Sequence, residues 1–227
     1  MSEEYPMRVI ARVHSDFSSK FGVPRQSGLV ESLESTVVFE PEYRNPDALR
    51  GIEGFSHLWL VWVFHRAVRE KWSPTVRPPR LGGNERMGVF ATRSPFRPNA
   101  IGLSSVELKE VRHSKDQGTV LVIRGADLMD GTPILDVKPY IPYADCHEDA
   151  VGGFAAAPAG ETLQVHLPEE LLSKLPEGKG EALRGVLAQD PRPHYQEDPE
   201  RVYGFTFAGK EVKFTVDGSE LTVRDIL

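Results

Sequence analysis

The sequence has 227 residues, 40% of them hydrophobic and 26% charged, with a formal net charge of −6 at pH 7. No run approaches the roughly 18 apolar residues of a membrane span, and the start, MSEEYPMRVIARV, lacks the layout of a signal peptide, so we expect a soluble, cytoplasmic protein. The single cysteine, Cys146, excludes an intramolecular disulfide and a multi-thiolate metal site.

Short strand-like runs follow one another along the first two thirds of the chain. They cover residues 8–15, 35–40, 57–65, 87–93, 101–111, 118–125, 133–141 and 161–167. Turn-forming residues separate them, and only residues 46–54 suggest one or two helical turns. The run HLWLVWVFH at 57–65 is almost continuously apolar, which predicts a strand buried on both faces. Many short strands with few helices predict a mainly β core, either a barrel or a sandwich.

The last third of the chain has a different character. Residues 144–160 are small and predict a loop, whereas 168–190 have the clearest helical periodicity of the sequence. Residues 191–227 predict short strands, with hairpins at 208–209 and 217–218. We therefore expect a β domain at 1–150 and a small α/β domain at 168–227.

The charge is distributed unevenly along the chain. Eight basic and two acidic residues lie between Arg66 and Arg97, so this segment carries about +6 and the remainder about −12. A basic patch on an acidic protein favours a directed contact with a polyanion. A positively charged, solvated loop explains the same pattern equally well.

The end of this basic segment reads TRSPFRPN, residues 92–99. Proline fixes its own φ and restricts the preceding residue, so Pro95 and Pro98 predict a stiff loop that carries Arg93 and Arg97. A guanidinium on a stiff loop loses less entropy when it grips a carboxylate or a phosphate. Phe96 offers either a stacking face for a base or a buried anchor for the loop.

Other polar groups occur where the predicted strands end. The motifs of dinucleotide, phosphate-loop and zinc-protease sites are absent, which favours a site built from such loops. The seven histidines show no paired metal-ligand spacing, so we expect no metal. Each polar group also has a structural reading: a strand-end histidine for His65, a tight turn for Asp130 and Gly131, and a same-face pair for Asp136 and Lys138. The members of these groups are Pro24, Arg25, Gln26, His65, Arg66, Asp127, Asp130, Gly131, Thr132, Asp136, Lys138 and Tyr140.

Several of these stretches resemble a known family. ATRSPFRPNAIGLSSVEL followed by GADLMDGTPILDVKPYIPYAD resembles the TsaA-like, or TrmO, family of tRNA methyltransferases, and FGVPRQSGL and GFSHLWLVWVFHR fit the same order. The tail, LAQDPRPHYQEDPERVYGFTFAGKEVKF, is similar to the C-terminal domain of the bacterial members. The resemblance implies a single-sheet β-barrel that is not a Rossmann fold, and a homodimer.

The resemblance also implies a reaction. Its members transfer a methyl group from S-adenosylmethionine to N6 of N6-threonylcarbamoyladenosine, beside the anticodon of threonine-reading tRNA. We expect Arg93 to suit the cofactor carboxylate, and Leu103 and the Gly131 turn to suit the adenine. The full set of implied cofactor contacts is Pro24, Arg25, Gln26, His65, Arg66, Arg93, Leu103, Asp130, Gly131, Thr132 and Pro133.

The N6 atom of this base belongs to a urea-like group and is a poor nucleophile unless its proton leaves during attack. The candidate catalytic residues are Asp136, His65 and Tyr140. The expected contacts with the anticodon arm of tRNA are Arg77, Arg80, Arg86, Arg97 and Lys138. A cluster of Arg192, His194 and Tyr195 either helps to dock this arm or has a packing role. Two alternatives stay open: a methyltransferase for another substrate, and a non-catalytic module that binds the cofactor or RNA.

Overall fold

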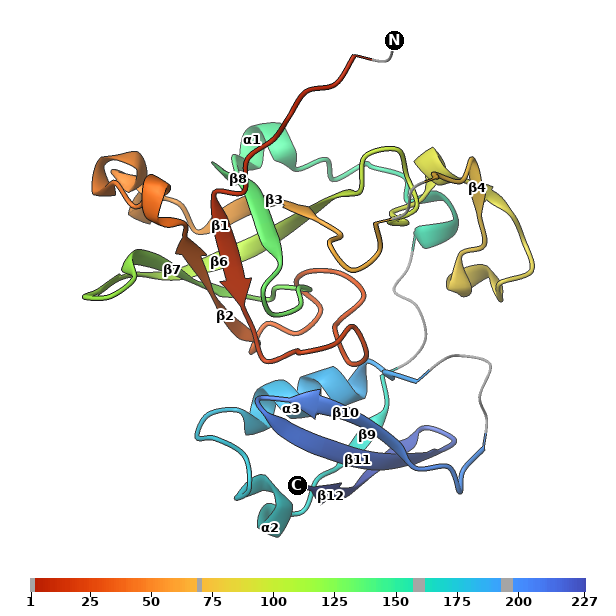
Figure 1. Cartoon of the computed structure of the whole chain (residues 1–227). Coiled ribbons are helices and arrows are strands. Elements are labelled where there is room, and N and C mark those ends of the chain that lie inside the picture. The colour runs from red at the N-terminus through yellow and green to blue at the C-terminus, as the bar shows by residue number, and fades with distance from the viewer. Residues whose placement is uncertain (1–2, 69–70, 157–161, 193–197) are drawn as a thin grey trace.

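The computed structural model describes residues 3–68, 71–156, 162–192 and 198–227, and it is mainly β, as the sequence predicts (Figure 1). Its strands are β1 (Ala11–His14), β2 (Glu34–Phe39), β3 (His57–Val63), β4 (Thr75–Val76), β5 (Met87–Gly88), β6 (Ile101–Ser114), β7 (Gly118–Arg124), β8 (Pro133–Pro139), β9 (Gln164–His166), β10 (Tyr203–Phe207), β11 (Lys210–Asp217) and β12 (Glu220–Ile226). Its α-helices are α1 (Pro142–Asp145), α2 (Glu169–Leu172) and α3 (Gly180–Ala188). None of the described helices is long and apolar enough to cross a lipid bilayer.

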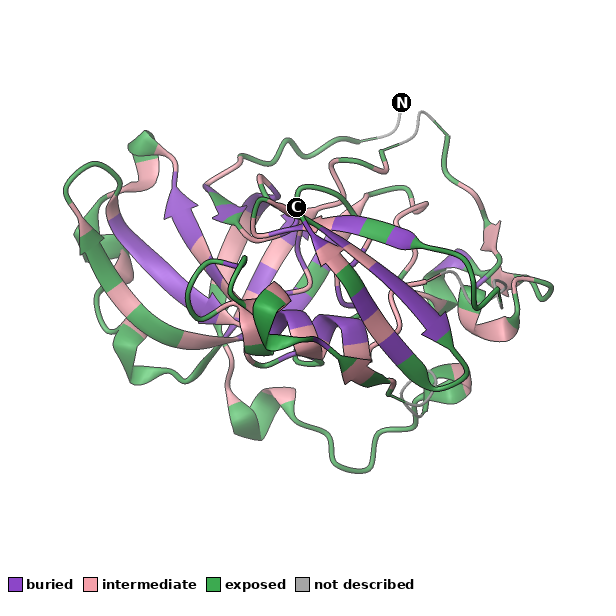
Figure 2. Ribbon diagram, turned by 90° about the horizontal axis from the view of Figure 1, so that it is seen from below, coloured by how far each residue is buried: buried purple, intermediate pink, exposed green. Residues whose placement is uncertain are grey.

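The first sheet closes on itself in the order β1-β2-β7-β6-β3-β8, with every pair antiparallel. Closure comes from β1, where Ala11 and Arg12 pair with Ile134 and Pro133 of β8. A closed sheet leaves no unpaired edge strand exposed to solvent. Buried and less buried residues alternate along its strands (Figure 2), so one face of each strand lines the barrel interior.

Strand β3 shows this alternation clearly. Leu58, Leu60 and Trp62 are buried, while Trp59 and Val61 on the other face are only partly covered. Trp59 packs instead against Tyr140, with ring centroids 5.5 Å apart. The prediction of a strand buried on both faces was wrong, because the outer face of a single closed sheet has no second layer over it.

Trp62 also determines which residue can lie beside it on β6. Its indole covers Gly102, its partner in the strand register, and a Cβ at Gly102 would lie 2.3 Å from Cε2 of the indole. The ring then donates its N–H to the buried hydroxyl of Ser104 at 3.0 Å. Glycine at position 102 is therefore a packing requirement of the barrel.

Between β3 and β6 the chain leaves the barrel and forms a basic excursion, residues 64–100, on the right in Figure 1. Within its described residues two short strands, β4 and β5, pair through Thr75 with Gly88 and Val76 with Met87. The strand predicted at 87–93 therefore ends after two residues and continues as a 3₁₀ turn at Val89–Ala91. Arg69 and Glu70, which contribute to the charge of this segment, lie outside the described residues.

The C-terminal part forms a second sheet in the order β10-β11-β12-β9, with β9 parallel to β12. Both predicted hairpins are present, between β10 and β11 and between β11 and β12. The run predicted at 161–167 belongs to this sheet and not to the first one. The predicted helix over 168–190 consists of α2 and α3, separated by a turn around Pro176 and Gly178.

The two parts share a hydrophobic core. Phe17, Val30 and Leu33, all from the connection between β1 and β2, are buried against the C-terminal core. Val30 lies so close to α3 that a Cβ at Gly185 would be 2.6 Å from its Cγ1. Lys179 adds an ion pair with Asp16 at 2.7 Å. The C-terminal part therefore covers the barrel end where β1 finishes, and the arrow of β1 points toward it (Figure 1).

Candidate functional site

One end of the barrel gathers most of the segments that the sequence marked. The antiparallel register places the end of β3, the start of β6 and the start of β8 side by side, through Val63 with Ile101 and Trp62 with Ile134. The end of β1 reaches the same edge, because Arg12 pairs with Pro133. We call this edge the rim. It brings together residues 24–26, 65–66, 93 and 130–133 from four separate loops.

A hydrogen bond joins two of these loops. Arg93, ahead of β6, donates from Nη1 to the side-chain carbonyl of Gln26, in the connection between β1 and β2. Both residues are exposed. Sequence reasoning assigned both residues to one site, and the structure places them in direct contact. A planar guanidinium held in this way suits bidentate binding of a carboxylate.

A partly buried carboxyl group lies beside this pair. Ser104 donates its hydroxyl to Asp127 at 2.6 Å, and Trp62 donates to the same hydroxyl oxygen. Burial raises the pKa of Asp127, while the Ser104 hydrogen bond and the charge of Arg93 act in the opposite direction. The sequence showed Asp127 only as one of several polar residues and assigned it no role. The available signal was its position three residues after the end of β7, at the same edge as the other loops.

His65 and Arg66 follow β3 on the rim. Burial, and after it the positive charges of Arg66 and Arg12, lower the pKa of His65 below its usual value. The imidazole is therefore neutral at neutral pH, and it can accept a proton. Arg12 itself donates to the carbonyl oxygen of Gly131 at 3.3 Å. It therefore connects the neighbourhood of His65 to the loop at residues 130–133.

The turn at 130–133 is held by its own hydrogen bonds. The backbone N–H groups of Asp130, Gly131 and Thr132 donate to Phe17, Val13 and Met129, respectively. Gly131 adopts a φ of 74°, in the left-handed region that favours glycine. These three N–H groups already have acceptors, so they are not available to an adenine edge. The expected contact between the backbone of this turn and the adenine stays a prediction. The carboxylate of Asp130 accepts from the Ser15 N–H at 3.2 Å and lies 3.3 Å from His14 Nδ1.

Leu103 and Asp136 lie on the outer face of the barrel. Each is opposite Val61 of β3, one on either side, so the three form a row across the sheet. Leu103 is 55% exposed, whereas Ser104 beside it points into the barrel. Asp136 forms an ion pair with Lys138 at 2.8 Å, which is the same-face pair that one reading of the sequence predicted.

Tyr140 does not lie with His65. Its backbone N–H donates to His57 at the other end of β3, and its ring packs on His57 and Trp59. Strand β3 runs from His57 to Val63, about 20 Å at the usual rise of a strand, and His65 follows its far end in a turn. The structure therefore separates two of the three candidate bases.

The arginines of the basic excursion differ in their surroundings. Arg77 is exposed, and Arg86 donates to the Thr75 hydroxyl at 3.1 Å. Arg97 folds back to donate to the carbonyls of Thr92 at 3.0 Å and Ser94 at 3.4 Å, which stiffens the TRSPFRPN loop. Arg80 lies near enough to Arg25 for its charge to lower the pKa of that residue, although burial is the larger cause.

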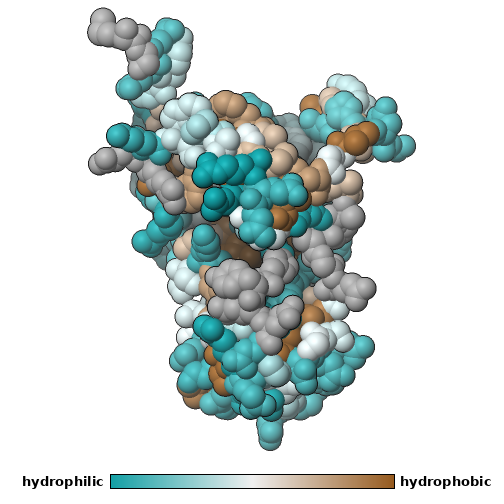
Figure 3. All heavy atoms as spheres, turned by 90° about the vertical axis from the view of Figure 1, so that its right-hand side faces the viewer, coloured by the Kyte–Doolittle hydropathy of each residue, from teal (hydrophilic) through white to brown (hydrophobic). Residues whose placement is uncertain are grey.

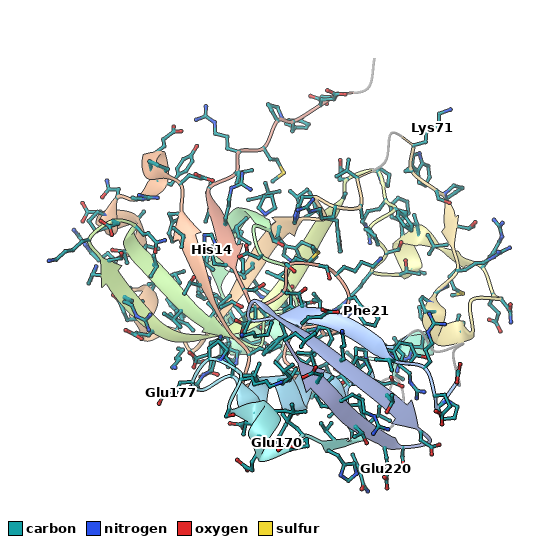
Figure 4. All side chains as sticks on the ribbon, turned by 60° about the horizontal axis from the view of Figure 1, so that its bottom comes forward. His14, Phe21, Lys71, Glu170, Glu177 and Glu220 are labelled. Carbon is teal, nitrogen blue, oxygen red and sulfur yellow. The ribbon has the colours of Figure 1, made fainter. Side chains whose placement is uncertain are left out.

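The last cluster that the sequence marked is at the C-terminal side. Arg192 pairs with Asp190 at 2.9 Å, while His194 and Tyr195 lie outside the described residues. Over the part of the chain that the structure describes, no three His, Cys, Asp or Glu side chains form a group suited to a metal ion. Figure 4 shows Phe21 beside the second sheet, against whose core it packs, and Lys71 on the excursion, well away from His14.

Fold and site together define a small closed antiparallel barrel with a cationic loop cluster at one end and a second sheet packed beneath it. Two family models match this chain: the tRNA-methyltransferase O N-terminal domain over residues 12–146 and the TrmO C-terminal domain over residues 160–227. The chain belongs to the tRNA-methyltransferase O family, which confirms the resemblance seen in the sequence.

Individual relatives agree with the family models. The tRNA (adenine(37)-N6)-methyltransferase of Escherichia coli K12 is 49% identical over 205 residues, covering 88% of this chain and 86% of that protein. A Pseudomonas aeruginosa protein named "Putative S-adenosylmethionine-dependent methyltransferase RcsF" is 42% identical over 203 residues, 86% of this chain and 85% of that protein. The crystal structure of TrmO from Pseudomonas aeruginosa superposes with a TM-score of 0.82 at 33% identity, covering 99% of each chain.

Proposed function

We propose that this protein transfers a methyl group from S-adenosylmethionine to N6 of adenosine 37 of tRNA. Membership of the tRNA-methyltransferase O family and the activity named for the Escherichia coli relative support this. We propose further that the base carries the N6-threonylcarbamoyl group, that the tRNA is the threonine-reading one, and that the protein acts in the cytoplasm as a homodimer. The observation that carries the proposal is the meeting of residues 24–26, 65–66, 93 and 130–133 at one rim of the barrel.

The residues at the rim suit the cofactor. Arg93 has guanidinium donors beyond the one bound to Gln26, and they would hold the cofactor carboxylate. Leu103 offers an exposed apolar surface to the adenine, and Pro24, Arg25, His65, Arg66 and the 130–133 turn would complete the walls of the site. When bound, the cofactor supplies an electrophilic methyl group. The protein then has to hold the methyl group and the attacking nitrogen in line. Such alignment lowers the activation free energy by about 7–11 kcal/mol for well-aligned groups.

The attacking nitrogen must lose its proton as the new carbon–nitrogen bond forms. Of the three candidate bases, His65 lies on the rim, and its lowered pKa leaves its ring free to accept a proton. Asp136 is engaged by Lys138 on the outer face, and Tyr140 lies at the other end of β3. We therefore propose His65 as the base. A general base of this kind contributes about 10²- to 10⁴-fold to the rate.

The basic excursion is proposed as the tRNA surface. Arg77, Arg80, Arg86 and Arg97 would meet phosphates, since they lie on the segment that continues directly into Arg93. Lys138 is proposed only as a secondary contact, because Asp136 already neutralises it. The chain is proposed to divide into a catalytic domain, 1–150, and a small domain, 168–227, whose core the β1–β2 connection joins.

The test is methyl transfer from labelled S-adenosylmethionine to two preparations of tRNA(Thr), one with and one without the threonylcarbamoyl group. We expect the label in the modified preparation, on the base at position 37, as identified by mass spectrometry of the digested RNA. Equal labelling of both preparations would contradict the proposed requirement for the threonylcarbamoyl group, while the proposed methyl transfer to tRNA would still stand. No labelling of either would overturn the proposed function.

A further inference from the structure

Two aromatic side chains of the basic excursion are exposed side by side. The rings of Trp72 and Phe90 have centroids 6.1 Å apart and planes only 25° from parallel. Trp72 is 49% exposed and Phe90 is 71% exposed. Large aromatic rings usually stabilise a fold by being buried. A stacked pair that is exposed to solvent contributes little in this way and therefore indicates a binding surface.

The backbone around the pair is held in place. Ser73 donates its N–H to Phe96 at 3.1 Å, and Val89 donates to Pro74 at 3.0 Å. Val89, next to Phe90, is buried, and the short β4–β5 ladder joins the two chain segments. Trp72 and Phe90 are therefore presented on a common support, so little entropy is lost when a flat ligand stacks on them.

The segment that carries these rings is strongly basic, and one of its arginines lies against Phe90. The guanidinium carbon of Arg97 lies 6.0 Å from the centroid of Phe90, and its donors to Thr92 and Ser94 hold it there. Residues 71–97 contain six basic residues and one acidic residue. Aromatic rings on a segment of strong net positive charge are typical of surfaces that bind single-stranded nucleic acid, where bases stack on the rings and basic side chains follow the phosphates.

We propose that Trp72 and Phe90 form a stacking platform for an unpaired base of the RNA substrate, distinct from the base that is methylated. The inference rests on the proposed function, since it takes the RNA as the substrate. The platform adjoins the rim through the loop that carries both Arg93 and Arg97, and Figure 3 shows a recess with hydrophobic walls on this side of the molecule. Sequence reasoning had considered Phe96 for stacking, but Phe96 is only partly exposed.

The experiment measures binding of an anticodon stem-loop RNA to the full-length protein at several salt concentrations. We expect the double variant Trp72→Ala/Phe90→Ala to bind roughly 5- to 150-fold more weakly, the range for loss of base stacking. Its slope of log affinity against log salt should stay unchanged, because no phosphate contact is lost. Arg86→Ala should instead reduce this slope by about one counterion. Tyr143→Ala, at a 91% exposed aromatic residue of α1, is the matched control and should bind as the wild type does.

A second arm identifies the stacked base. Single abasic substitutions in the loop RNA are measured with the wild type and with the double variant. We expect one substitution that weakens binding to the wild type and has no further effect in the double variant. Unchanged RNA binding by the double variant would overturn the platform, as would a change in its oligomeric state by light scattering, which would assign the rings to a contact between copies. Failure of the wild type to bind RNA would overturn the proposed function as well.

Discussion

Phe205, in the C-terminal sheet, lies directly against Gly22 of the β1–β2 connection. A Cβ at Gly22 would be 2.4 Å from Cδ2 of the Phe205 ring, and the ring also packs edge-on against Phe21. A few residues further on, Arg25 donates to the backbone carbonyl of Asp190 at 3.2 Å. The C-terminal part therefore holds both sides of the segment that supplies Pro24 and Gln26 to the rim.

Gly22→Ala should weaken both folding and cofactor binding. The new methyl group would overlap Phe205, and overpacking of this kind costs about 1–3 kcal/mol. Gly51→Ala is the matched control, because Gly51 has a similar φ of 87°, against 92° for Gly22, and nothing lies within 4 Å of its added Cβ. Urea unfolding and calorimetric titration with S-adenosylmethionine measure the two effects. Equal losses in both variants would show that backbone strain alone is responsible.

Arg93→Ala should bind S-adenosylmethionine about 10- to 150-fold more weakly, the range for loss of a hydrogen bond to a charged group. Arg93→Lys should recover only part of the affinity, since an ammonium cannot bind a carboxylate in the same bidentate way. Arg112→Ala removes an exposed arginine of β6 that is paired with Glu110, far along the strand from the rim. Titration calorimetry should give this control the affinity of the wild type; a similar loss in both alanine variants would exclude a specific role for Arg93.

The rate of methyl transfer should stay level as the pH falls from 8 to about 6.5, the usual pKa of histidine, and should decline only below that value. The reason is that burial and two neighbouring arginines lower the pKa of His65, so the neutral form persists to lower pH. Single-turnover rates across this range test the prediction. His65→Ala should lose most of the rate, whereas Asp136→Asn should retain it; the reverse result would move the base to Asp136.

Asp127→Asn should change how stability depends on pH. The pKa of Asp127 is raised in the folded protein, so the folded state binds the extra proton. The contribution of Asp127 to the free energy of unfolding is therefore fully present below its pKa in the unfolded chain, about 3.9. It is lost as the pH rises through its pKa in the folded protein. The amide does not titrate, so the free energy of unfolding of the variant should improve relative to the wild type as the pH increases. Urea titrations from pH 4 to 8 measure this difference, and a constant difference would contradict the assignment.

Gly102→Ala should destabilise the barrel by about 1–3 kcal/mol, because the added methyl group would displace the Trp62 indole. The hydrogen bond from Trp62 to Ser104 should weaken with it, which disturbs the support of Asp127. Gly88→Ala serves as the control, since Gly88 has a negative φ and open space around its Cβ. Denaturant midpoints at a single pH compare the two, and similar midpoints would mean that the indole moves aside without cost.

The sequence by itself determined the mainly β class, both C-terminal hairpins and the family, because these depend on local alternation, turn residues and contiguous motifs. It also marked the loops of the rim, since Arg93 and His65 each stand at the end of a run predicted as a strand, and Gln26 lies in the loop between two such runs. Their meeting depends on strand register: Gln26 and Arg93 touch only because a closed antiparallel sheet brings the ends of β1 and β3 together with the starts of β6 and β8.

Only the tertiary structure decided the rest. The outward face of β3, the separation of Tyr140 from His65 and the burial of Phe17, Val30 and Leu33 in the C-terminal core all depend on contacts between distant segments. Trp72 and Phe90 lie 18 positions apart along the chain, and no local pattern says that their rings stack in solvent. Local sequence governs how each segment bends and which face is apolar, whereas side-chain burial is a property of the closed barrel and the sheet beneath it.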